Sequence, residues 1–292
     1  MSRLRRLLAG MLPLVLAAVL FGTVGAFALD GLTRSMTFGA GYGDDDLLVV
    51  LAIGSDGGPP HRPGNPMAAR ADGIHLLVVD TRTTRMTVVD IPRDSAIGGG
   101  KVNAHLAFGG PERLEAQLEA WSGLPIDFWA LGSFWSLEQV ATGLGGLEID
   151  VQQSMHDPFS GTNLEPGFQR VDPGQVLAFS RDRKSLANGD IGRSHNQGRM
   201  IISALQQMRT QSGGELTNVL GMVELFERSA VHNIPPSEVL PLALLALRIP
   251  PEHIEQVTIS GPFGTIGGGS VIRPQPGDLF TRLLAGQVGP PQ

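Results

Sequence analysis

The stretch LLVVLAIG, from Leu47 to Gly54, predicts the fold more clearly than any other part of this sequence. It follows a glycine-rich connector and three consecutive aspartates, and it contains no polar residue before its final glycine. A continuous apolar run of this length, rich in β-branched residues, is typical of a strand that is buried on both faces. Strands of this kind occur in sheets that helices cover on each side, so the stretch predicts an α/β domain.

Further strands and helices are predicted along the rest of the chain. Strands are expected at Ile74–Asp80, Met86–Ile91, Leu147–Val151 and Glu255–Ser260, and a polar turn joins the first two into a hairpin. Helices are expected at Pro111–Gly123, Ser133–Gly146, Arg193–Arg209 and Ser237–Arg248. The simplest assembly is one mixed sheet with helices on both faces, an α/β/α sandwich. The Gly/Pro-rich segment from Gly261 onward is predicted to form loops.

The N-terminal segment has the pattern of a membrane anchor. Three arginines, Arg3, Arg5 and Arg6, precede an uncharged run from Leu7 to Leu29, and roughly 20 apolar residues span a bilayer. We therefore expect a cytoplasmic stretch at 1–6, a single transmembrane anchor at 7–29, a linker at 30–46, an extracytoplasmic domain at 47–285 and a tail at 286–292. A cleaved signal peptide is the alternative, because Ala26-Phe27-Ala28 resembles a cleavage site. Both interpretations export the domain.

Composition narrows the class of function. The chain has no cysteine, which excludes disulfides, thiol nucleophiles and cysteine-ligated zinc. It carries 22 Lys and Arg residues against 28 Asp and Glu residues, a formal charge of −6. Nucleic-acid-binding domains are normally basic, so we expect no nucleic-acid partner. Local clusters of arginine in an acidic chain point instead to a specific anionic ligand.

Charged residues gather where the predicted strands begin and end. Asp56 follows the first strand, Arg70 and Asp72 precede the second, and Arg93 and Asp94 close the third. Loops at the ends of buried strands are where α/β proteins usually place ligand sites. Strand ends are also exposed and collect charge without any function, and that alternative stays open for each residue taken singly.

A second charged stretch runs from Ser180 to Gln197. In the predicted helix, steps of four lead back from Ile201 to Gln197 and Arg193, so both should face the buried side. An arginine there favours an anion at the helix start, although Asp190 or water are alternative partners. Arg181 and Arg183 share a face only if their segment is extended. Asp182 and Lys184 are then predicted to be solvated.

These residue types match the chemistry of phosphoryl transfer. Guanidinium groups bind phosphate oxygens bidentately, and carboxylates such as Asp56 and Asp72 suit Mg²⁺, which takes a few carboxylates together with water and phosphate oxygens. A metal and arginines together neutralise charge on a transferring phosphoryl group. The chain has no P-loop, H-E-x-x-H or G-x-S-x-G motif. His75 and the aromatic residues at 121–135 are interpreted as core, with a sugar or lipid platform as the alternative for the aromatics.

The order of these motifs resembles the extracytoplasmic domain of the LytR-CpsA-Psr family. The resemblance rests on seven segments between Leu47 and Met208: GSD, RAD, IPRD, KVNAHLAFGG, LGGLEIDV, DPGQVLAFSRDR and GDIGRSHNQ. It implies an α/β/α fold and a bacterial membrane-anchored phosphotransferase. Such enzymes move a glycopolymer from a polyprenyl-pyrophosphate carrier to a hydroxyl group of peptidoglycan. The implied partners are the lipid-linked glycan, peptidoglycan and the cell membrane.

The resemblance also implies roles for individual residues. Asp56 and Asp72 would hold Mg²⁺ or Mn²⁺, and Asp72 is a candidate for accepting the proton of the attacking hydroxyl. Pyrophosphate contacts are implied for five arginines: Arg70, Arg93, Arg181, Arg183 and Arg193. Supporting positions in the same site are Asp94, Lys101, Asn103, Asp190 and Gln197. The polyprenyl chain would need an apolar groove, for which the aliphatic-rich helices are candidates.

The sequence departs from the family pattern at three positions. Gly58 and Asn196 stand where an arginine is common, and Asp90 stands where a small hydroxyl residue is common. Arg62 is a candidate substitute for the arginine missing at Gly58. With fewer positive charges than usual, two other functions stay open besides the transferase. One is a weakly active or inactive module that binds polyprenyl-phosphate lipids, and the other is a pyrophosphatase that acts on lipid carriers.

Overall fold

The structure is a computed structural model that describes residues 46–58 and 65–291. Among these residues a six-stranded sheet has the order β11-β6-β1-β2-β3-β12. Its strands are β1 (Leu47–Ser55), β2 (Ala71–Asp80), β3 (Arg85–Asp90), β6 (Phe128–Ser133), β11 (Ala230–His232) and β12 (Ile254–Thr258). β1 pairs antiparallel with β2 and parallel with β6. The predicted mixed central sheet is confirmed.

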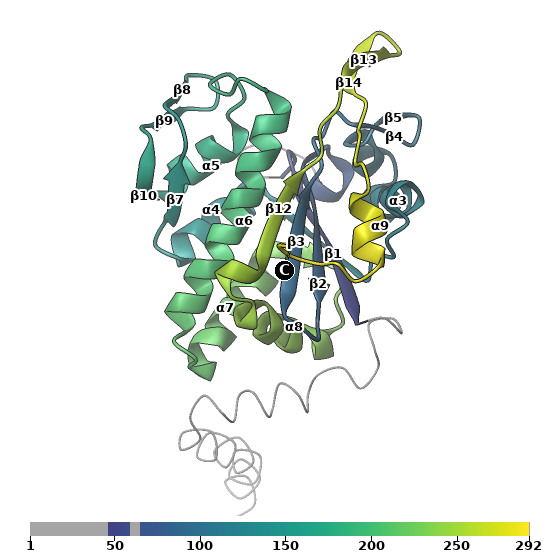
Figure 1. Ribbon diagram of the computed structural model, residues 1–292. Helices are drawn as coiled ribbons and strands as arrows, with labels where there is room; N and C mark the ends of the chain where they lie inside the picture. The colour runs from purple at the N-terminus through teal and green to yellow at the C-terminus, as the bar shows by residue number, and fades with distance from the viewer. Residues whose placement is uncertain (1–45, 59–64, 292) are drawn as a thin grey trace, which may run out of the picture. The chain divides into compact units, whose positions relative to one another are not determined.

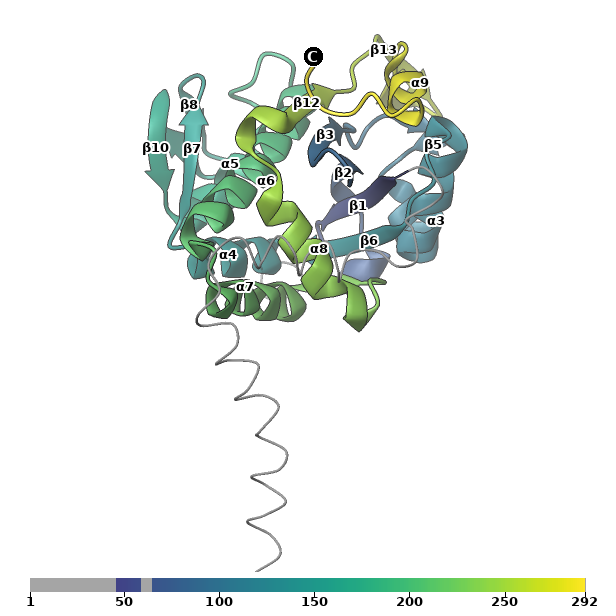
Figure 2. The same ribbon diagram turned by 60° about the horizontal axis from the view of Figure 1, so that its bottom comes forward.

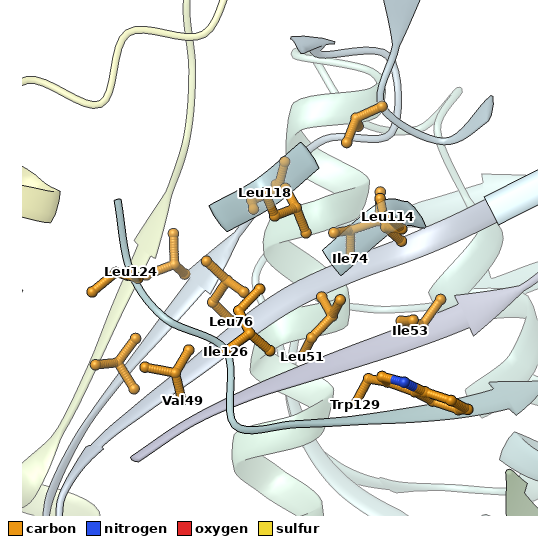
Figure 3. Packing of buried hydrophobic residues seen from close by; sticks show 14 of the residues in the cluster. Val49, Leu51, Ile53, Ile74, Leu76, Leu114, Leu118, Leu124, Ile126 and Trp129 are labelled. Carbon is orange, nitrogen blue, oxygen red and sulfur yellow. The ribbon is translucent and has the colours of Figure 1, made fainter. Parts of the chain in front are cut away.

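Alternate residues of β1 contribute to the main hydrophobic core. Leu51 lies opposite Leu76 of β2 and Trp129 of β6, and all three are buried in one cluster. Figure 3 shows these side chains on the same face of the sheet, together with Val49 and Ile53 of the same strand. The side chains of β1 point alternately to the two faces of the sheet, and helices cover both faces. The strand is therefore apolar along its whole length.

Two helices cover this face: α3 (Ala104–Ser122) and α9 (Leu279–Leu284). Leu114 and Leu118 of α3 are fully buried against the sheet, as Figure 3 shows, and burying such a side chain contributes about 1.5–3 kcal/mol. The predicted helix from Pro111 is confirmed and ends at Gly123 as expected. One further turn precedes Pro111, separated from the rest by non-helical backbone at 109–110.

The opposite face of the sheet is covered by the remaining α-helices of the described chain. They are α4 (Phe134–Gly143), α5 (Pro173–Arg181), α6 (Asp190–Ser212), α7 (Leu216–Ser229) and α8 (Pro236–Arg248). Figures 1 and 2 show them on the side of the sheet opposite α3 and α9. α6 packs on β2, β3 and β12. Helices therefore flank both faces, which confirms the predicted α/β/α arrangement.

Shorter strands pair in twos outside the central sheet. They are β4 (Ala96–Ile97) with β5 (Gly100–Lys101), β7 (Leu147–Val151) with β10 (Gly167–Val171), β8 (Met155–Asp157) with β9 (Thr162–Leu164), and β13 (Phe263–Ile266) with β14 (Gly269–Ile272). Two 3₁₀ turns, η1 (Pro66–Ala68) and η2 (Pro251–His253), complete the elements. The strand predicted at Leu147–Val151 is confirmed, but it pairs with β10. The prediction of a single sheet is therefore wrong.

The segment after Gly261 was predicted as loops, and this prediction is wrong. It forms the β13–β14 hairpin and α9, and the side chains of Leu279, Phe280 and Leu283 are buried in the main core. Phe280 also meets Trp121 of α3 edge to face, with ring centroids 4.9 Å apart. A helix of six residues is too short to show helical periodicity in sequence, so only tertiary packing identifies it.

Other differences concern boundaries and elements that were not predicted, which include β6 and the helices α5 and α7. β2 begins at Ala71, three residues earlier than predicted, so Asp72 lies inside the strand. β6 was not predicted, and the predicted helix at 133–146 ends at Gly143. The expected anchor at 7–29 lies outside the described residues. Among the residues that are described, no helix is both long and apolar enough to cross a bilayer.

Candidate active site

The candidate site lies where β1 and β6 end and β2 begins. The pairing of β1 with β2 shifts register between Gly54 and Ser55, so that Gly54 faces Gly73 while Ser55 faces Ala71. Asp72 is thus the extra residue of a β-bulge. Bulges re-aim side chains and are over-represented beside active sites. Here the bulge turns the Asp72 carboxylate out of the strand pattern and toward Arg93 and Arg193.

Two arginines and two aspartates form a compact group, which we call the Arg–Asp cluster: Asp72, Arg93, Asp190 and Arg193. Arg93 Nη1 donates to both oxygens of Asp72, at 2.7 and 2.8 Å. Arg193 Nη2 lies 2.7 Å from Asp190 Oδ1, and Arg93 Nε lies 3.6 Å from the same oxygen. Arg193 Nη1 is 3.7 Å from Asp72 Oδ2. The four groups carry no net formal charge.

Burial perturbs the ionisation of this cluster. It raises the pKa of Asp190, because desolvation outweighs the attraction of Arg193 and Arg93. It also lowers the pKa of Arg193, since desolvation again exceeds the effect of the two carboxylates. Burial alone would lower the pKa of Arg93, but the charges of Asp72 and Asp190 raise it overall. Shifts of this kind, caused by burial and specific charged partners, are typical of functional sites.

Gln197 lies one helical turn beyond Arg193 and extends the same buried stripe of α6. Its Nε2 donates to Ser180 O at 2.8 Å and approaches Asp72 O at 3.4 Å. Its Oε1 is buried without a hydrogen-bond partner in the described part of the chain. The predicted stripe is confirmed, since Arg193 and Gln197 are 3% and 9% exposed and both face the sheet. The Gln197 amide leaves one acceptor available for a ligand.

Arg70, Arg181 and Arg183, the other three arginines that the resemblance implies, are exposed. Arg181 ends α5 and lies 5.1 Å from the ring centre of Phe134. Arg183 is close enough to Arg193 for its charge to lower the pKa of Arg193. Within the described residues, no carboxylate pairs with any of these three arginines. They supply positive charge that the neutral cluster lacks.

The predicted extended segment at Arg181–Arg183 is only partly correct. Arg181 is helical, and only from Asp182 does the backbone become extended. The prediction that Asp182 is solvated is wrong, because this residue is fully buried and its Oδ1 accepts from the backbone N–H of Ser185. A carboxylate is well suited to stabilise such a tight turn. Lys184 is exposed as expected and lies over the ring of Phe159.

Three further predicted site residues, Asp94, Lys101 and Asn103, stabilise the segment around Arg93. Lys101 Nζ donates to Asp94 Oδ1 at 2.8 Å. The backbone of Asn103 bridges two segments, because its N–H donates to Arg93 O and its carbonyl accepts from Ala71 N, each at 3.2 Å. These contacts hold the Arg93 turn against the start of β2. Within the described residues, the side chains of Lys101 and Asn103 form no hydrogen bond with a side chain of the Arg–Asp cluster.

Asp56 and Asp72 were predicted as ligands of Mg²⁺, and their donor set is compatible with that ion. Asp56 is buried, and its Oδ1 accepts from the backbone N–H of Arg70. No group of three His, Asp or Glu side chains that would form a metal site by itself occurs within 46–58 and 65–291. Mg²⁺ often takes one or two carboxylates and completes its shell with water and phosphate oxygens. Two carboxylates at neighbouring strand ends meet that requirement.

An apolar cavity of about 400 Å³ opens directly beside the Arg–Asp cluster. It lies between the second face of the sheet and helices α4, α6 and α7. Small residues form its sheet wall, and aliphatic side chains form its helical wall: Ala52, Gly54, Ala130 and Gly132 on one side, and Leu137, Val140, Ile201, Ala204, Leu205 and Leu225 on the other. At its polar end lie Asp72, Ser180 and Gln197.

The position of this cavity was not predicted, although the small residues of β1 and β6 indicate it. Ala52 and Gly54 of β1 pair with Ala130 and Gly132 of β6 on the same face, so small residues in two neighbouring strands leave space that bulky ones would fill. The aromatic residues at 121–135 lie in different surroundings. Trp129 is in the core, Phe134 lines the cavity, and Trp135 is 39% exposed. The core interpretation is therefore wrong for Trp135.

Comparison with known proteins identifies the family. The model of the LytR_cpsA_psr family matches residues 33–278. The chain belongs to the LytR_cpsA_psr family. The predicted resemblance is confirmed, and the match covers every residue of the Arg–Asp cluster.

Several curated relatives of the chain have names that refer to the cell wall. A probable cell wall biosynthesis protein LcpB from Corynebacterium glutamicum is 33% identical over 178 residues, which cover 59% of this chain and 40% of that protein. The polyisoprenyl-teichoic acid–peptidoglycan teichoic acid transferase TagU from Bacillus licheniformis is 27% identical over 188 residues, covering 62% and 57%. The chain spans about half the length of the curated relatives it matches, from 40% to 58%.

Several solved structures share the fold. Protein gbs0355 from Streptococcus agalactiae superimposes with a TM-score of 0.69 at 21% identity, over 83% of this chain and 86% of that one. Bacillus subtilis TagV gives 0.67 at 21% identity, over 83% and 96%. TagT bound to LI-WTA gives 0.65 at 18% identity, over 82% and 90%. At these identities the likeness establishes the fold alone.

The two positions where the family commonly has arginine lie in different surroundings. Gly58 has a φ of +108°, and a Cβ there would lie 3.2 Å from the Cβ of Ser133, so a larger residue would require a different loop conformation. Its candidate substitute, Arg62, lies outside the described residues. Asn196 packs against Met155 on another face of α6 than Arg193 and Gln197. Asn196 is therefore not a missing member of the Arg–Asp cluster.

Proposed function

We propose that the chain is a cell-envelope phosphotransferase that moves a glycopolymer from a polyprenyl-pyrophosphate carrier to peptidoglycan. One observation carries the proposal: an apolar cavity is lined at its polar end by Asp72, which pairs with the arginines of the Arg–Asp cluster. A polyprenyl pyrophosphate has the same division into an apolar chain and an anionic head. The names of relatives, which include teichoic acid transferases and a cell wall biosynthesis protein, support the same class of reaction.

The charges around the cavity mouth suit a diphosphate. Arg93 and Arg193 are already paired with carboxylates, so the free positive charge comes from Arg70, Arg181 and Arg183. Guanidinium forks bind phosphate oxygens bidentately. In this arrangement the paired arginines orient the diphosphate, and the exposed ones neutralise its charge. As charge develops on the bridging oxygen, the same arginines stabilise the transition state.

The reaction exchanges one phosphorus–oxygen bond for another. The oxygen of a peptidoglycan sugar hydroxyl bonds to the phosphorus that carries the glycan, and the bond from this phosphorus to the bridging oxygen breaks. Polyprenyl phosphate leaves, and the hydroxyl proton passes to a carboxylate. Asp72 is the proposed acceptor, because its side chain is more exposed than that of Asp190, at 14% against 9%. A general base must reach the proton it removes.

Asp56 and Asp72 are proposed to hold Mg²⁺ or Mn²⁺ together with the diphosphate. The ion would supply Lewis-acid stabilisation of the phosphate oxygens. The roles of Asp94, Lys101 and Asn103 are then to fix the Arg93 turn, and Gln197 holds Asp72 and α5 in place through its Nε2.

A transfer assay tests the function directly. The purified domain is incubated with a polyprenyl-pyrophosphate glycan, Mg²⁺ and peptidoglycan oligomers, and joined product and free phosphate are measured. We expect joined product with the wild type and at least about a 100-fold loss with Asp72→Ala, the scale of removing a general base. Phosphate without joined product would instead indicate a pyrophosphatase. Tight lipid binding with neither product would indicate a binding module.

The location that we propose is the cell membrane, with a single N-terminal anchor and the domain outside the cell. The support is the uncharged run at Leu7–Leu29 behind three arginines. We expect the full chain to stay in the membrane fraction after washing at alkaline pH, because a spanning helix is held by its apolar length. Release by the wash would contradict the anchor, and a shortened chain in the medium would indicate cleavage near Ala28.

A further inference from the structure

A second cavity, of about 170 Å³, lies beside the first turns of α6. We call it the amide pocket. Residues that follow β7, the turn before α6 and α6 itself line it: Gln152, Gln153, Met155, Leu186, Ala187, Asn188, Gly192, His195 and Asn196. Met155 and Asn196 are buried and form its floor, and the glutamines and Asn188 are exposed at its rim. Its lining combines amide and imidazole side chains with apolar ones, whereas the lining of the larger cavity is almost entirely apolar.

The amide pocket adjoins the Arg–Asp cluster through α6. Arg193 and Gln197 face the cluster, while Gly192 and Asn196, the residues directly before them, face the amide pocket. Each residue of an α-helix advances only about 1.5 Å along the axis. The cluster and the amide pocket therefore lie on neighbouring faces of the first turns of α6.

The chemistry of the lining favours an uncharged ligand rich in hydroxyl groups. Side-chain amides both donate and accept hydrogen bonds, as sugar hydroxyls do. Among the described residues that line the pocket there is no Asp, Glu, Lys or Arg. The imidazole Nδ1 of His195 lies 3.0 Å from Thr258 Oγ1, and burial lowers its pKa. A second phosphate would find no arginine or lysine in this lining.

Asn196 is the residue of the amide pocket that is best placed to bind a ligand. It is 7% exposed, and within the described residues its Nδ2 has a single contact, to Met155 Sδ at 3.9 Å. A thioether sulfur is a weak acceptor. Buried amide groups normally have a good partner, so an acceptor oxygen from a ligand would satisfy this donor.

We propose that the amide pocket binds a sugar unit, either of the glycopolymer next to the transferred phosphate or of the acceptor strand. This inference rests on the proposed function, since it takes the diphosphate to lie at the Arg–Asp cluster. The pocket then distinguishes a sugar-bearing lipid from the bare polyprenyl diphosphate. The cluster recognises the phosphates in both.

Binding measurements with Asn196→Leu test the proposal. Leucine has a similar volume but makes no hydrogen bond. The probes are undecaprenyl diphosphate, undecaprenyl-diphosphoryl-N-acetylglucosamine and chitotriose, each titrated against the domain in detergent. We expect the wild type to bind the sugar-bearing lipid about tenfold more tightly than the bare lipid, a difference of about 1.4 kcal/mol. Asn196→Leu should remove this difference and leave the affinity for the bare lipid unchanged.

Two further variants make the result specific. Gln153→Ala removes an amide at the exposed rim and should weaken sugar-lipid binding without affecting folding. Asn218→Leu, on α7 and outside both cavities, is the matched control and should change nothing. If the pocket binds a sugar of the lipid-linked glycopolymer, chitotriose will not bind. If it binds a sugar of the peptidoglycan acceptor, chitotriose will bind, and Asn196→Leu will weaken chitotriose binding.

Several results would overturn the amide pocket as a sugar site. One is an equal loss of both lipids in Asn196→Leu, which would mean that the residue acts through the cluster. Another is a wild-type sugar preference that both pocket variants retain. If neither lipid binds the wild type, the proposed function fails, and chitotriose alone decides whether the pocket binds sugar. Absence of binding to all three probes would contradict both.

Discussion

Replacing Arg193 by methionine is expected to lower the free energy of unfolding by about 3–5 kcal/mol and to abolish binding of polyprenyl diphosphate. Arg193 is only 3% exposed and lies 2.7 Å from Asp190 Oδ1. Removing one partner of a buried ion pair leaves the other charge uncompensated, which carries a cost of about this size. Urea unfolding gives the stability change, and lipid titration gives the loss of affinity.

A double variant separates the two effects of this change. In Asp190→Asn with Arg193→Met, no unpaired charge remains at that position, so most of the lost stability should return. Lipid binding should not return, because the guanidinium is still missing. Arg209→Met, an exposed change on the same helix, should leave both properties unchanged. A stable Arg193→Met variant that still binds the lipid would show that the cluster is not the phosphate site.

The inward position of Arg193 was predictable from sequence because it depends on local periodicity. Residues four apart on a helix share a face, and the chain from Arg193 to Ile201 is helical in the structure. The strand at β1 was predictable for a similar reason, since an apolar run buried on both faces needs no knowledge of its neighbours. For both Arg193 and β1, the residues of one short segment are sufficient for the prediction.

The pairing of Asp72 with Arg93 was not predictable, because it depends on contacts across the sheet. The bulge that turns Asp72 toward Arg93 exists only in the register of β1 with β2. The burial of Asp182 depends likewise on how α5 meets α6. Periodicity describes one element at a time, and such contacts join elements that are far apart in sequence.

Asp90 shows how a residue outside the family pattern can be built into the structure. It is fully buried, and its carboxylate accepts from Gln256 and Thr258 of β12 and contacts His75 Nδ1 at 2.8 Å. This confirms His75 as a satisfied buried histidine, although it also borders the apolar cavity. A Cβ at Gly198 would lie 2.0 Å from Asp90 Oδ1. Because Gly198 has no side chain, the backbone of α6 packs directly against the Asp90 carboxylate. This contact helps to position the helix that carries Arg193.

Replacing Ala52 by phenylalanine is expected to abolish transfer from long-chain lipids while the domain stays folded. Ala52 lies on the sheet wall of the apolar cavity, opposite Ala130 of β6 and His75 of β2. A benzyl group there occupies space that the polyprenyl chain needs. Since it grows into empty volume, the stability change should stay below about 1.5 kcal/mol, as for tolerated changes in a core.

Chain length is the property that makes this prediction specific to the cavity. Undecaprenyl diphosphate should bind Ala52→Phe at least about 100-fold more weakly than the wild type, which is about 2.7 kcal/mol and matches roughly three buried methylene groups. A short probe, geranyl diphosphate, relies mainly on the arginines and should lose much less. Ala285→Phe, an exposed change, is the matched control. Equal losses for long and short lipids would place the defect at the Arg–Asp cluster, and no loss for either would mean that the lipid chain does not enter this cavity.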